Sequence, residues 1–153
     1  MFFRRKIDIY SKRPGIGGRL SNFTKRTFVF DDIPCRSIEG VLQSMKFETP
    51  CEQRIVCGLW GLQAKLAGDL KADWKTTKAL HWNGCDYPRE GEEYQALLTR
   101  LYTEVYRQDP QFRKDIKKSA KYRLVHSIGK SNPQDTVLTE KEFIDRLIKL
   151  QNG

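Results

Sequence analysis

Glu39, Gln43 and Lys46 are spaced four and three positions apart, so a helix would project all three side chains in nearly one direction. A lysine beside a glutamate in a partly dry site has a lowered pKa when desolvation outweighs the pairing. Its neutral amine can then act as a nucleophile toward a carbonyl or an opened sugar. Because the same residue types are common on exposed helix faces, the spacing leaves both a catalytic stripe and a solvated surface open.

A second group of candidates lies in and after a glycine-rich loop. Asn22 can donate and accept hydrogen bonds, and the adjacent Phe23 can stack on a base. Arg19 is the candidate phosphate ligand because of its charge and its place in that loop. Trp74 belongs to a further basic and aromatic segment. A purely structural interpretation also stands, with Asn22 as a turn residue and both Phe23 and Trp74 as packing residues.

The helix that would carry the first group begins after Ser37, a competent N-cap. Its apolar residues fall at i, i+3, i+4 and i+7 and form one stripe: Ile38, Val41, Leu42 and Met45. Since Glu39 is one residue beyond Ile38, the polar stripe lies about 100° around the helix from the apolar one. We therefore expect Glu39, Gln43 and Lys46 at the edge of the buried surface, where they can wall a cleft.

Helix and strand patterns alternate along the rest of the chain. Alternating or β-branched runs predict strands over residues 7–10, 27–30 and 122–128, with a flexible basic loop over 11–23. Apolar periodicity predicts helices over 52–59, 62–70 and 91–106, then one from Asp109-Pro110 to Lys117 and a last one with the capping box Thr139 to Glu142. Without repeats or linkers, we expect a single α+β domain over residues 1–153, mainly α-helical with a small β-sheet.

The composition is that of a globular protein with a basic surface. A formal charge of +9 in 153 residues indicates attraction to polyanions, unless the lysines and arginines only solvate the surface. The sequence has no apolar run near the roughly 20 residues of a membrane helix and no secretory signal, so we expect a cytoplasmic protein without a membrane partner. The four cysteines form no CxxC pair and only two histidines accompany them, so we expect free thiols, no metal and no cofactor.

The chain resembles the NADAR, or YbiA-like (RibX-like), N-glycosidase family in motifs that follow the family's order. These are Leu20-Ser21-Asn22-Phe23, Ser37-Ile38-Glu39 leading through Gln43 to Lys46-Phe47, Ala64-Lys65 with Gly68, and Asp73-Trp74. The similarity spans residues 7–128 and implies a YbiA-like fold. Near its end the family usually has an Asp followed by Trp-Gly, whereas residues 125–130 here contain no tryptophan. His126 in this segment is either a substitute titrating group or a strand residue.

The resemblance implies hydrolysis of a bond between ribose C1 and a nitrogen. The expected reaction removes ADP-ribose from modified guanine, and the alternative substrates are ribosylamino-pyrimidine phosphates of early riboflavin biosynthesis. Lys46 would be the nucleophile that forms a Schiff base and Glu39 its acid–base partner, while Asn22, Gln43 and Trp74 would position the nucleotide. The expected partner is therefore ADP-ribosylated nucleic acid or a ribosyl-base phosphate metabolite, in an oligomeric state left open. A non-catalytic binder of ADP-ribosylated nucleic acid and a nonspecific nucleic-acid-binding protein are the competing interpretations.

Overall fold

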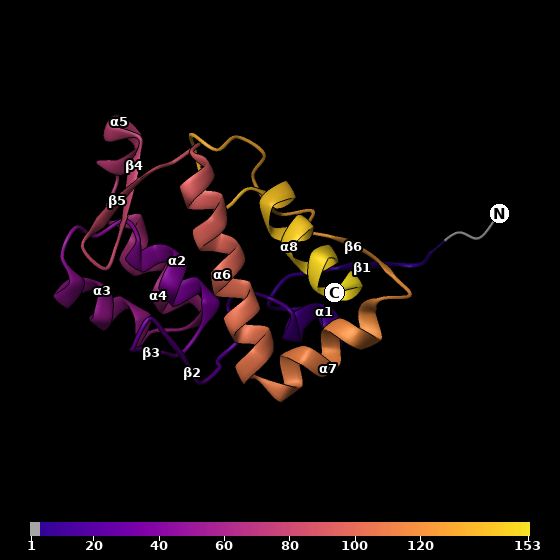
Figure 1. The fold of residues 1–153 in the computed structure, drawn as a ribbon. Helices are drawn as coiled ribbons and strands as arrows, with labels where there is room; N and C mark the ends of the chain where they lie inside the picture. The colour runs from indigo at the N-terminus through magenta and orange to yellow at the C-terminus, as the bar shows by residue number, and fades with distance from the viewer. Residues whose placement is uncertain (1–3) are drawn as a thin grey trace.

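The longest helix, α6 (Glu92–Gln108), runs between two groups of elements in the computed structural model, which describes residues 4–153 (Figure 1). Helix α6 contacts elements that precede it in the chain and also the two helices that follow it. The residues that α6 buries recur every three or four positions: Tyr94, Leu97, Leu98, Leu101, Tyr102 and Val105. The helix predicted over residues 91–106 is thus confirmed, with its apolar face at the centre of the molecule.

The first group is built around α2 (Ile38–Ser44), which packs against α3 (Pro50–Cys57) and α4 (Gly61–Asp69). The predicted N-cap is confirmed, since Ser37 Oγ accepts a hydrogen bond of 2.8 Å from the backbone nitrogen of Gly40. Gly40 also lets the helices approach closely. A Cβ at this position would lie 2.8 Å from the backbone oxygen of Leu59, where no side chain fits.

Two short hairpins complete this group. Strands β2 (Phe28–Phe30) and β3 (Ile33–Cys35) are antiparallel, as are β4 (Ala79–Trp82) and β5 (Cys85–Pro88), which follow the short helix α5 (Trp74–Thr77). Asn83 and Gly84 form the second turn with φ of 51° and 88°, the left-handed conformation that a two-residue hairpin turn requires. Of these elements the sequence interpretation had predicted only the strand over residues 27–30.

The second group joins the two ends of the chain. Strand β1 (Lys6–Asp8) pairs in parallel with β6 (Arg123–Val125) (Figure 1). Helix α8 (Glu140–Asn152) packs against β6, and α7 (Pro110–Ser119) packs against α8. The side chain of Asp109 caps α7, and Thr139 and Glu142 form the expected capping box of α8. The predicted strand over 122–128 is confirmed only for its first part, because the chain leaves the sheet after Val125.

The prediction of a flexible loop over residues 11–23 was wrong in part, since the segment contains the one-turn helix α1 (Ile16–Arg19). Its glycines permit close packing here. A Cβ at Gly17 would lie 2.8 Å from the backbone oxygen of Asp8, and one at Gly18 would lie 2.0 Å from that of Arg13. Glycine is thus required at both positions because neighbouring backbone leaves no room for a Cβ.

One hydrophobic core links the two groups, with α6 contributing to it along its length. Over residues 4–153 the chain forms three two-stranded sheets and helices predominate, which makes this an α+β fold, as predicted. Among residues 4–153, none of the helices combines the length and the apolar character needed to cross a lipid bilayer.

Candidate active site

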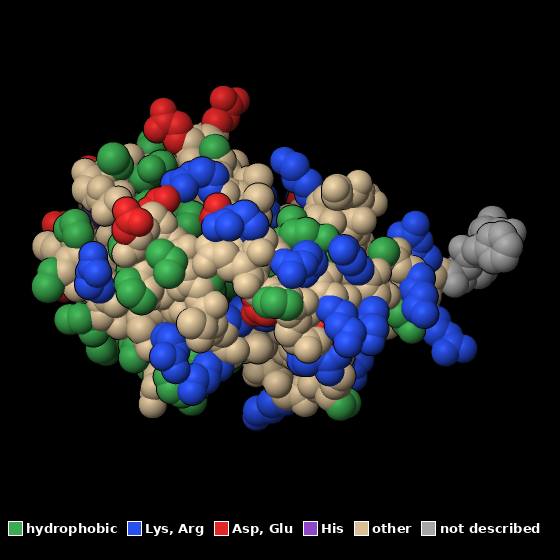
Figure 2. All heavy atoms as spheres, turned by 60° about the horizontal axis from the view of Figure 1, so that its bottom comes forward, with side chains coloured by type: hydrophobic (Ala, Val, Ile, Leu, Met, Phe, Trp, Pro, Cys, Tyr) green, Lys and Arg blue, Asp and Glu red, His purple; other side chains and the backbone are tan. Residues whose placement is uncertain are grey.

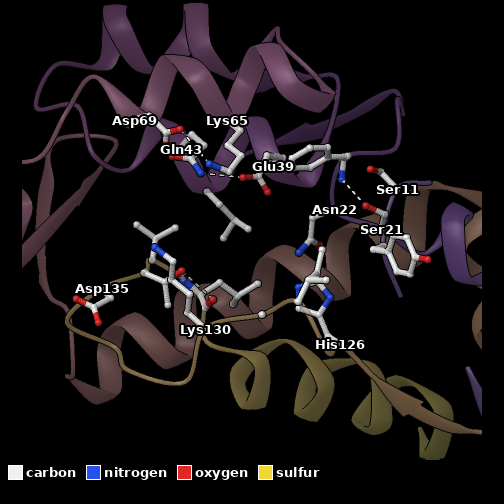
Figure 3. Close-up of a pocket in the computed structure, with 18 of the residues that line it drawn as sticks. Ser11, Ser21, Asn22, Glu39, Gln43, Lys65, Asp69, His126, Lys130 and Asp135 are labelled. Carbon is white, nitrogen blue, oxygen red and sulfur yellow. Dashed lines mark hydrogen bonds and ion pairs between the residues drawn. The ribbon is translucent and has the colours of Figure 1, made fainter. Parts of the chain in front are cut away.

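A cavity of about 250 Å³ lies between the two groups of elements (Figure 3). One wall comes from α2 and α4, and the opposite wall from the connection between β6 and α8; the segments after β1 and after α1 close the side. Its polar lining residues are Tyr10, Ser11, Ser21, Asn22, Glu39, Gln43, Lys46, Lys65, Asp69, His126, Lys130, Asp135 and Thr136. Five segments of the chain therefore meet at one recess.

Glu39 and Gln43 form the wall that α2 contributes. They lie one turn apart, and Gln43 Nε2 donates a hydrogen bond of 2.7 Å to Glu39 Oε1 (Figure 3). Gly68 of α4 makes room for the amide, because a Cβ there would lie 1.7 Å from Gln43 Oε1. The Glu39 carboxylate is thereby held in one orientation while it still faces the cavity.

Lys46 lies just past the end of α2, where its backbone nitrogen still bonds to the oxygen of Gln43 at 3.1 Å. The residue is only 9% exposed. Its Nζ donates a hydrogen bond of 3.3 Å to the backbone oxygen of Gly68 and lies 5.9 Å from the centre of the Trp74 ring. No ion pair within 4.0 Å is formed by this amine among the described residues, so its main partners are a carbonyl oxygen and an aromatic face.

The electrostatics of this pair favour the neutral forms of both groups. Removal from water lowers the pKa of the Lys46 amine, against the opposing attraction of Asp69 and Glu39. Burial raises the pKa of the Glu39 carboxyl, and the hydrogen bond from Gln43 and the charge of Lys46 offset this only in part. The cavity thus holds a lysine whose pKa is lowered and a carboxyl whose pKa is raised, both by removal from water.

Asn22 and Phe23 line the cavity from the side. The buried hydroxyl of Tyr102 donates a hydrogen bond of 2.7 Å to Asn22 Oδ1. Because this bond occupies the amide oxygen, the Asn22 amide nitrogen is turned toward the cavity as a donor (Figure 3). The site therefore offers a fixed donor next to an aromatic ring, which is how a sugar hydroxyl and a base can be held together.

The opposite wall is attached to the rest of the fold by buried polar contacts. Arg89 Nε donates a hydrogen bond of 2.9 Å to the backbone oxygen of Thr136. The guanidinium also forms a bidentate ion pair with the Glu142 carboxylate, with distances of 2.7 and 3.0 Å. The Tyr94 hydroxyl bonds to the oxygen of Val137 at 2.5 Å. These contacts fix residues 136–138 as a wall of the cavity although the segment has no regular secondary structure.

His126 lies on the same side, just beyond β6. Its Nδ1 is 2.6 Å from the backbone oxygen of Ile9, and its ring meets the edge of Phe143 at 5.1 Å between centroids. Since a carbonyl oxygen only accepts, Nδ1 carries the proton of this bond. His126 therefore ties the segments after β1 and β6 together at the cavity, and its position is outside the strand.

The sequence model of the family described as bacteriophage protein GP30.3 matches residues 15–152 of this chain. The chain belongs to this family. An "uncharacterized 17.1 kDa protein in Gp30-rIII intergenic region" of Enterobacteria phage T4 is 37% identical over 135 residues, which cover 88% of this chain and 89% of that protein. The NMR structure of the E. coli protein YbiA is similar with a TM-score of 0.63 at 18% identity, covering 99% of this chain and 86% of that chain. This GP30.3 family member thus has the YbiA-like fold that its motifs implied.

Two residues that the sequence placed in the site of this GP30.3 family member lie outside the cavity. Arg19 of α1 forms a two-pronged ion pair with Asp115 of α7, at 3.0 Å for both bonds, and faces another surface. Trp74 is 3% exposed and lines a different hollow. Its ring packs near the Lys46 amine, and because it is buried it is closed to a ligand in the cavity. The expected phosphate contact of Arg19 and the nucleotide contact of Trp74 have no geometric support.

Lys65 and Lys130, which sequence reasoning did not assign to the site, line the cavity from opposite walls. Both are exposed, and Lys65 pairs with Asp69 at 2.9 Å. The i, i+3, i+4 pattern of α4 could have placed Lys65 beside Gly68, but no local signal places Lys130 there, because its position depends on the wall that Arg89 holds. Within residues 4–153 no group of three or more His, Cys, Asp or Glu side chains is arranged to hold a metal ion.

Proposed function

We propose that this protein is an N-glycosidase that hydrolyses the bond between ribose C1 and a nitrogen, with Lys46 as the nucleophile and Glu39 as the acid–base group. One observation carries the proposal. A buried lysine and a recessed glutamate face the same cavity, with pKa values displaced toward the neutral amine and the protonated carboxyl. These are the two protonation states that attack on C1 and departure of a nitrogen base require.

The reaction proceeds in balanced steps. The lone pair of Lys46 Nζ forms a bond to C1 as the C1–N bond breaks, and Glu39 transfers its proton to the departing nitrogen. The new ammonium then loses a proton to Glu39, which gives it to the ring oxygen as the C1–O bond opens, and a Schiff base forms between C1 and Lys46 Nζ. Water adds to C1 and gives a proton to Glu39. Glu39 passes this proton to Lys46 Nζ and takes up the hydroxyl proton as the carbinolamine collapses, which releases the aldehyde form of the sugar with its phosphates and restores the neutral amine and the protonated carboxyl. Proton transfer by a positioned group such as Glu39 typically contributes about 10² to 10⁴ in rate.

The cavity's lining supports the substrate class that we propose. Asn22 offers an amide donor and Phe23 an aromatic ring, while the exposed lysines Lys65 and Lys130 stand at opposite walls, where they suit phosphate groups. A base, a ribose and phosphates are common to ADP-ribosyl-guanine and to the ribosylamino-pyrimidine phosphates of early riboflavin biosynthesis. We propose ADP-ribosyl-guanine, in DNA or as a nucleotide, as the first substrate, with the pyrimidine phosphates as the second.

The test is release of ADP-ribose from a guanine-modified DNA oligonucleotide, combined with borohydride trapping and intact mass. Wild type should release ADP-ribose and yield a trapped adduct on one lysine. Lys46→Ala should do neither. Lys65→Ala is the matched control, because Lys65 lines the same cavity but is exposed and paired with Asp69. It should weaken substrate binding and still give the adduct.

Each outcome separates the interpretations. Turnover that survives in Lys46→Ala contradicts the covalent mechanism, and an adduct lost only in Lys65→Ala transfers the nucleophile to that residue. Release from the pyrimidine phosphates alone changes the substrate and keeps the mechanism. Saturable binding of the modified oligonucleotide without any product would make the protein a binder of ADP-ribosylated nucleic acid.

A further inference from the structure

The exposed side of α7 carries a face of lysines. Lys114, Lys117, Lys118 and Lys121 fall at i, i+3, i+4 and i+7, and all four are exposed. The opposite side of the helix is buried and consists of Phe112, Asp115, Ile116 and Ser119. Lys121 lies just past the end of α7, where the chain turns toward β6. The helix therefore presents a positively charged surface about 10 Å long, from a rise of about 1.5 Å per residue.

These lysines lack the compensation found on other surface helices of the described chain. On α4, α6 and α8 an exposed cation pairs with a carboxylate three or four positions away, namely Lys65–Asp69, Arg107–Glu104 and Lys141–Asp145. The one carboxylate of α7, Asp115, is 1% exposed and bound to Arg19 instead. Favourable interaction with the helix dipole accounts for the lysines of the last turn and leaves Lys114 unexplained.

Further cations lie on the β1–β6 pair, whose strand β6 begins two residues after Lys121, and beside the cavity. Lys6 and Arg123 lie directly opposite each other in the parallel register, although like charges at facing positions destabilise a strand pair. Beyond β1, Arg13 lies over the ring of Tyr10 at 5.5 Å, and Tyr10 lines the cavity. Figure 2 shows lysine and arginine side chains gathered toward the end of the molecule where the chain begins.

We propose that the lysine face of α7, extended by Lys6 and Arg123, is a docking surface for the sugar-phosphate backbone of a nucleic acid. Its length matches about three nucleotides at a rise of about 3.4 Å per strand. Lysine ammonium groups act as point charges without base recognition, so the surface binds without sequence preference. This goes beyond the proposed hydrolysis, because it concerns an unmodified polynucleotide held outside the cavity.

A membrane is the other anionic partner, and the surface chemistry disfavours it. Membrane-surface helices combine a basic side with exposed large apolar side chains that enter the lipid. Among the described residues, exposed large hydrophobic side chains lie off α7, β1 and β6, chiefly on and around α3 and α4: Ile55, Trp60, Leu62, Leu66 and Leu70. The large apolar side chains of α7 itself, Phe112 and Ile116, are fully buried.

The test measures binding of unmodified 20-nucleotide DNA, single- and double-stranded, by fluorescence anisotropy over a range of salt concentrations. The test variant combines Lys114→Gln, Lys117→Gln, Lys118→Gln and Lys121→Gln. The matched control combines Lys25→Gln, Lys75→Gln, Lys78→Gln and Lys141→Gln, which removes the same charge from exposed lysines on other surfaces. Thermal unfolding of both variants verifies that the fold is retained.

Wild type should bind with an affinity that falls linearly with salt on logarithmic axes. The α7 variant should lose more than about tenfold in affinity at low salt, and its salt slope should fall by about three to four, while the control changes far less. Equal losses in both variants would assign the binding to net charge and overturn the proposal. Absence of binding, or binding to anionic vesicles instead of DNA, would overturn it too. Lys46→Ala should bind as wild type does, so that this result is independent of the hydrolysis.

Discussion

Replacement of Gln43 by methionine tests how the fold sets the proton affinity of Glu39. In the structure Gln43 is 6% exposed, and its Nε2 donates a hydrogen bond of 2.7 Å to Glu39 Oε1. This hydrogen bond favours the ionised form of the Glu39 carboxylate. Methionine is also long and unbranched, but its thioether cannot donate. Gln43→Met therefore removes the one hydrogen bond that holds the Glu39 pKa down and leaves the desolvation that raises it.

The expected change follows from the strength of that bond. A hydrogen bond to a charged group contributes about 1.5–3 kcal/mol, and one pKa unit corresponds to about 1.4 kcal/mol. The Glu39 pKa should therefore rise by about one to two units. Because the proposed reaction needs Glu39 protonated, the rate should persist to a pH about one to two units higher than in wild type.

The assay is the pH dependence of kcat/KM for ADP-ribose release, with the Glu39 carboxyl followed separately by NMR titration. Gln53→Met is the control, since Gln53 is also buried and its amide nitrogen donates to the backbone oxygens of Phe47 and His81. Gln53→Met should lower the stability of the protein without shifting the pH at which kcat/KM falls on the alkaline side. If Gln43→Met is folded and active but its kcat/KM falls at the same alkaline pH as that of wild type, the assigned role of the Gln43–Glu39 bond is refuted.

Three further changes address the parts that support the cavity. Tyr102→Phe removes the hydroxyl that orients the cavity amide, so KM should rise and urea denaturation should show a loss of about 1–2 kcal/mol. Arg89→Met leaves the Glu142 carboxylate without its buried partner, and should lower the free energy of unfolding by about 3–5 kcal/mol, with Glu142→Leu in the same chain restoring much of it. Gly40→Ala places a Cβ 2.8 Å from the oxygen of Leu59, and thermal denaturation should show a free energy of unfolding lower by about 1–3 kcal/mol.

The Arg89 variant should also change the pH dependence of stability. Burial raises the pKa of Glu142, but hydrogen bonds from Arg89, Thr139 and Gln95 outweigh it and hold the pKa below the ordinary value of 4.5. A lowered carboxyl pKa gives stability that is present above the unfolded value and lost as the pH falls through the folded one. Without Arg89 the loss of stability on acidification below pH 4.5 should become shallower, as measured by urea titrations at several pH values.

Local chemistry predicted those parts of the fold whose contacts lie close in sequence. The cap at Ser37 and the capping box of α8 depend on residues three positions away, and both are present. The Asn83-Gly84 turn carried an equally local signal for the β4–β5 hairpin, and the interpretation missed it. The helical turn at Ile16–Arg19 could not be predicted this way, because its glycines are selected by contact with other backbone segments.

The same distinction holds for the candidate site. Glu39, Gln43 and Lys46 come from one helix and its end, so their spacing predicted their shared direction. Arg19 was misplaced because its partner, Asp115, lies 96 residues along the chain. No local pattern indicates that a carboxylate so distant will take up the charge.

The pairing of β1 with β6 also determines when the cavity can exist. Ile9 and His126, which join the segments after these strands, are 117 positions apart. Contacts of such sequence separation form late, since the loop entropy is lost before they stabilise the chain. A chain leaving the ribosome from its N-terminus holds Glu39 and Lys46 long before the opposite wall is synthesised. The cavity is therefore completed only after residues 126–138 have been synthesised, and a chain terminated before them carries both residues without the opposite wall.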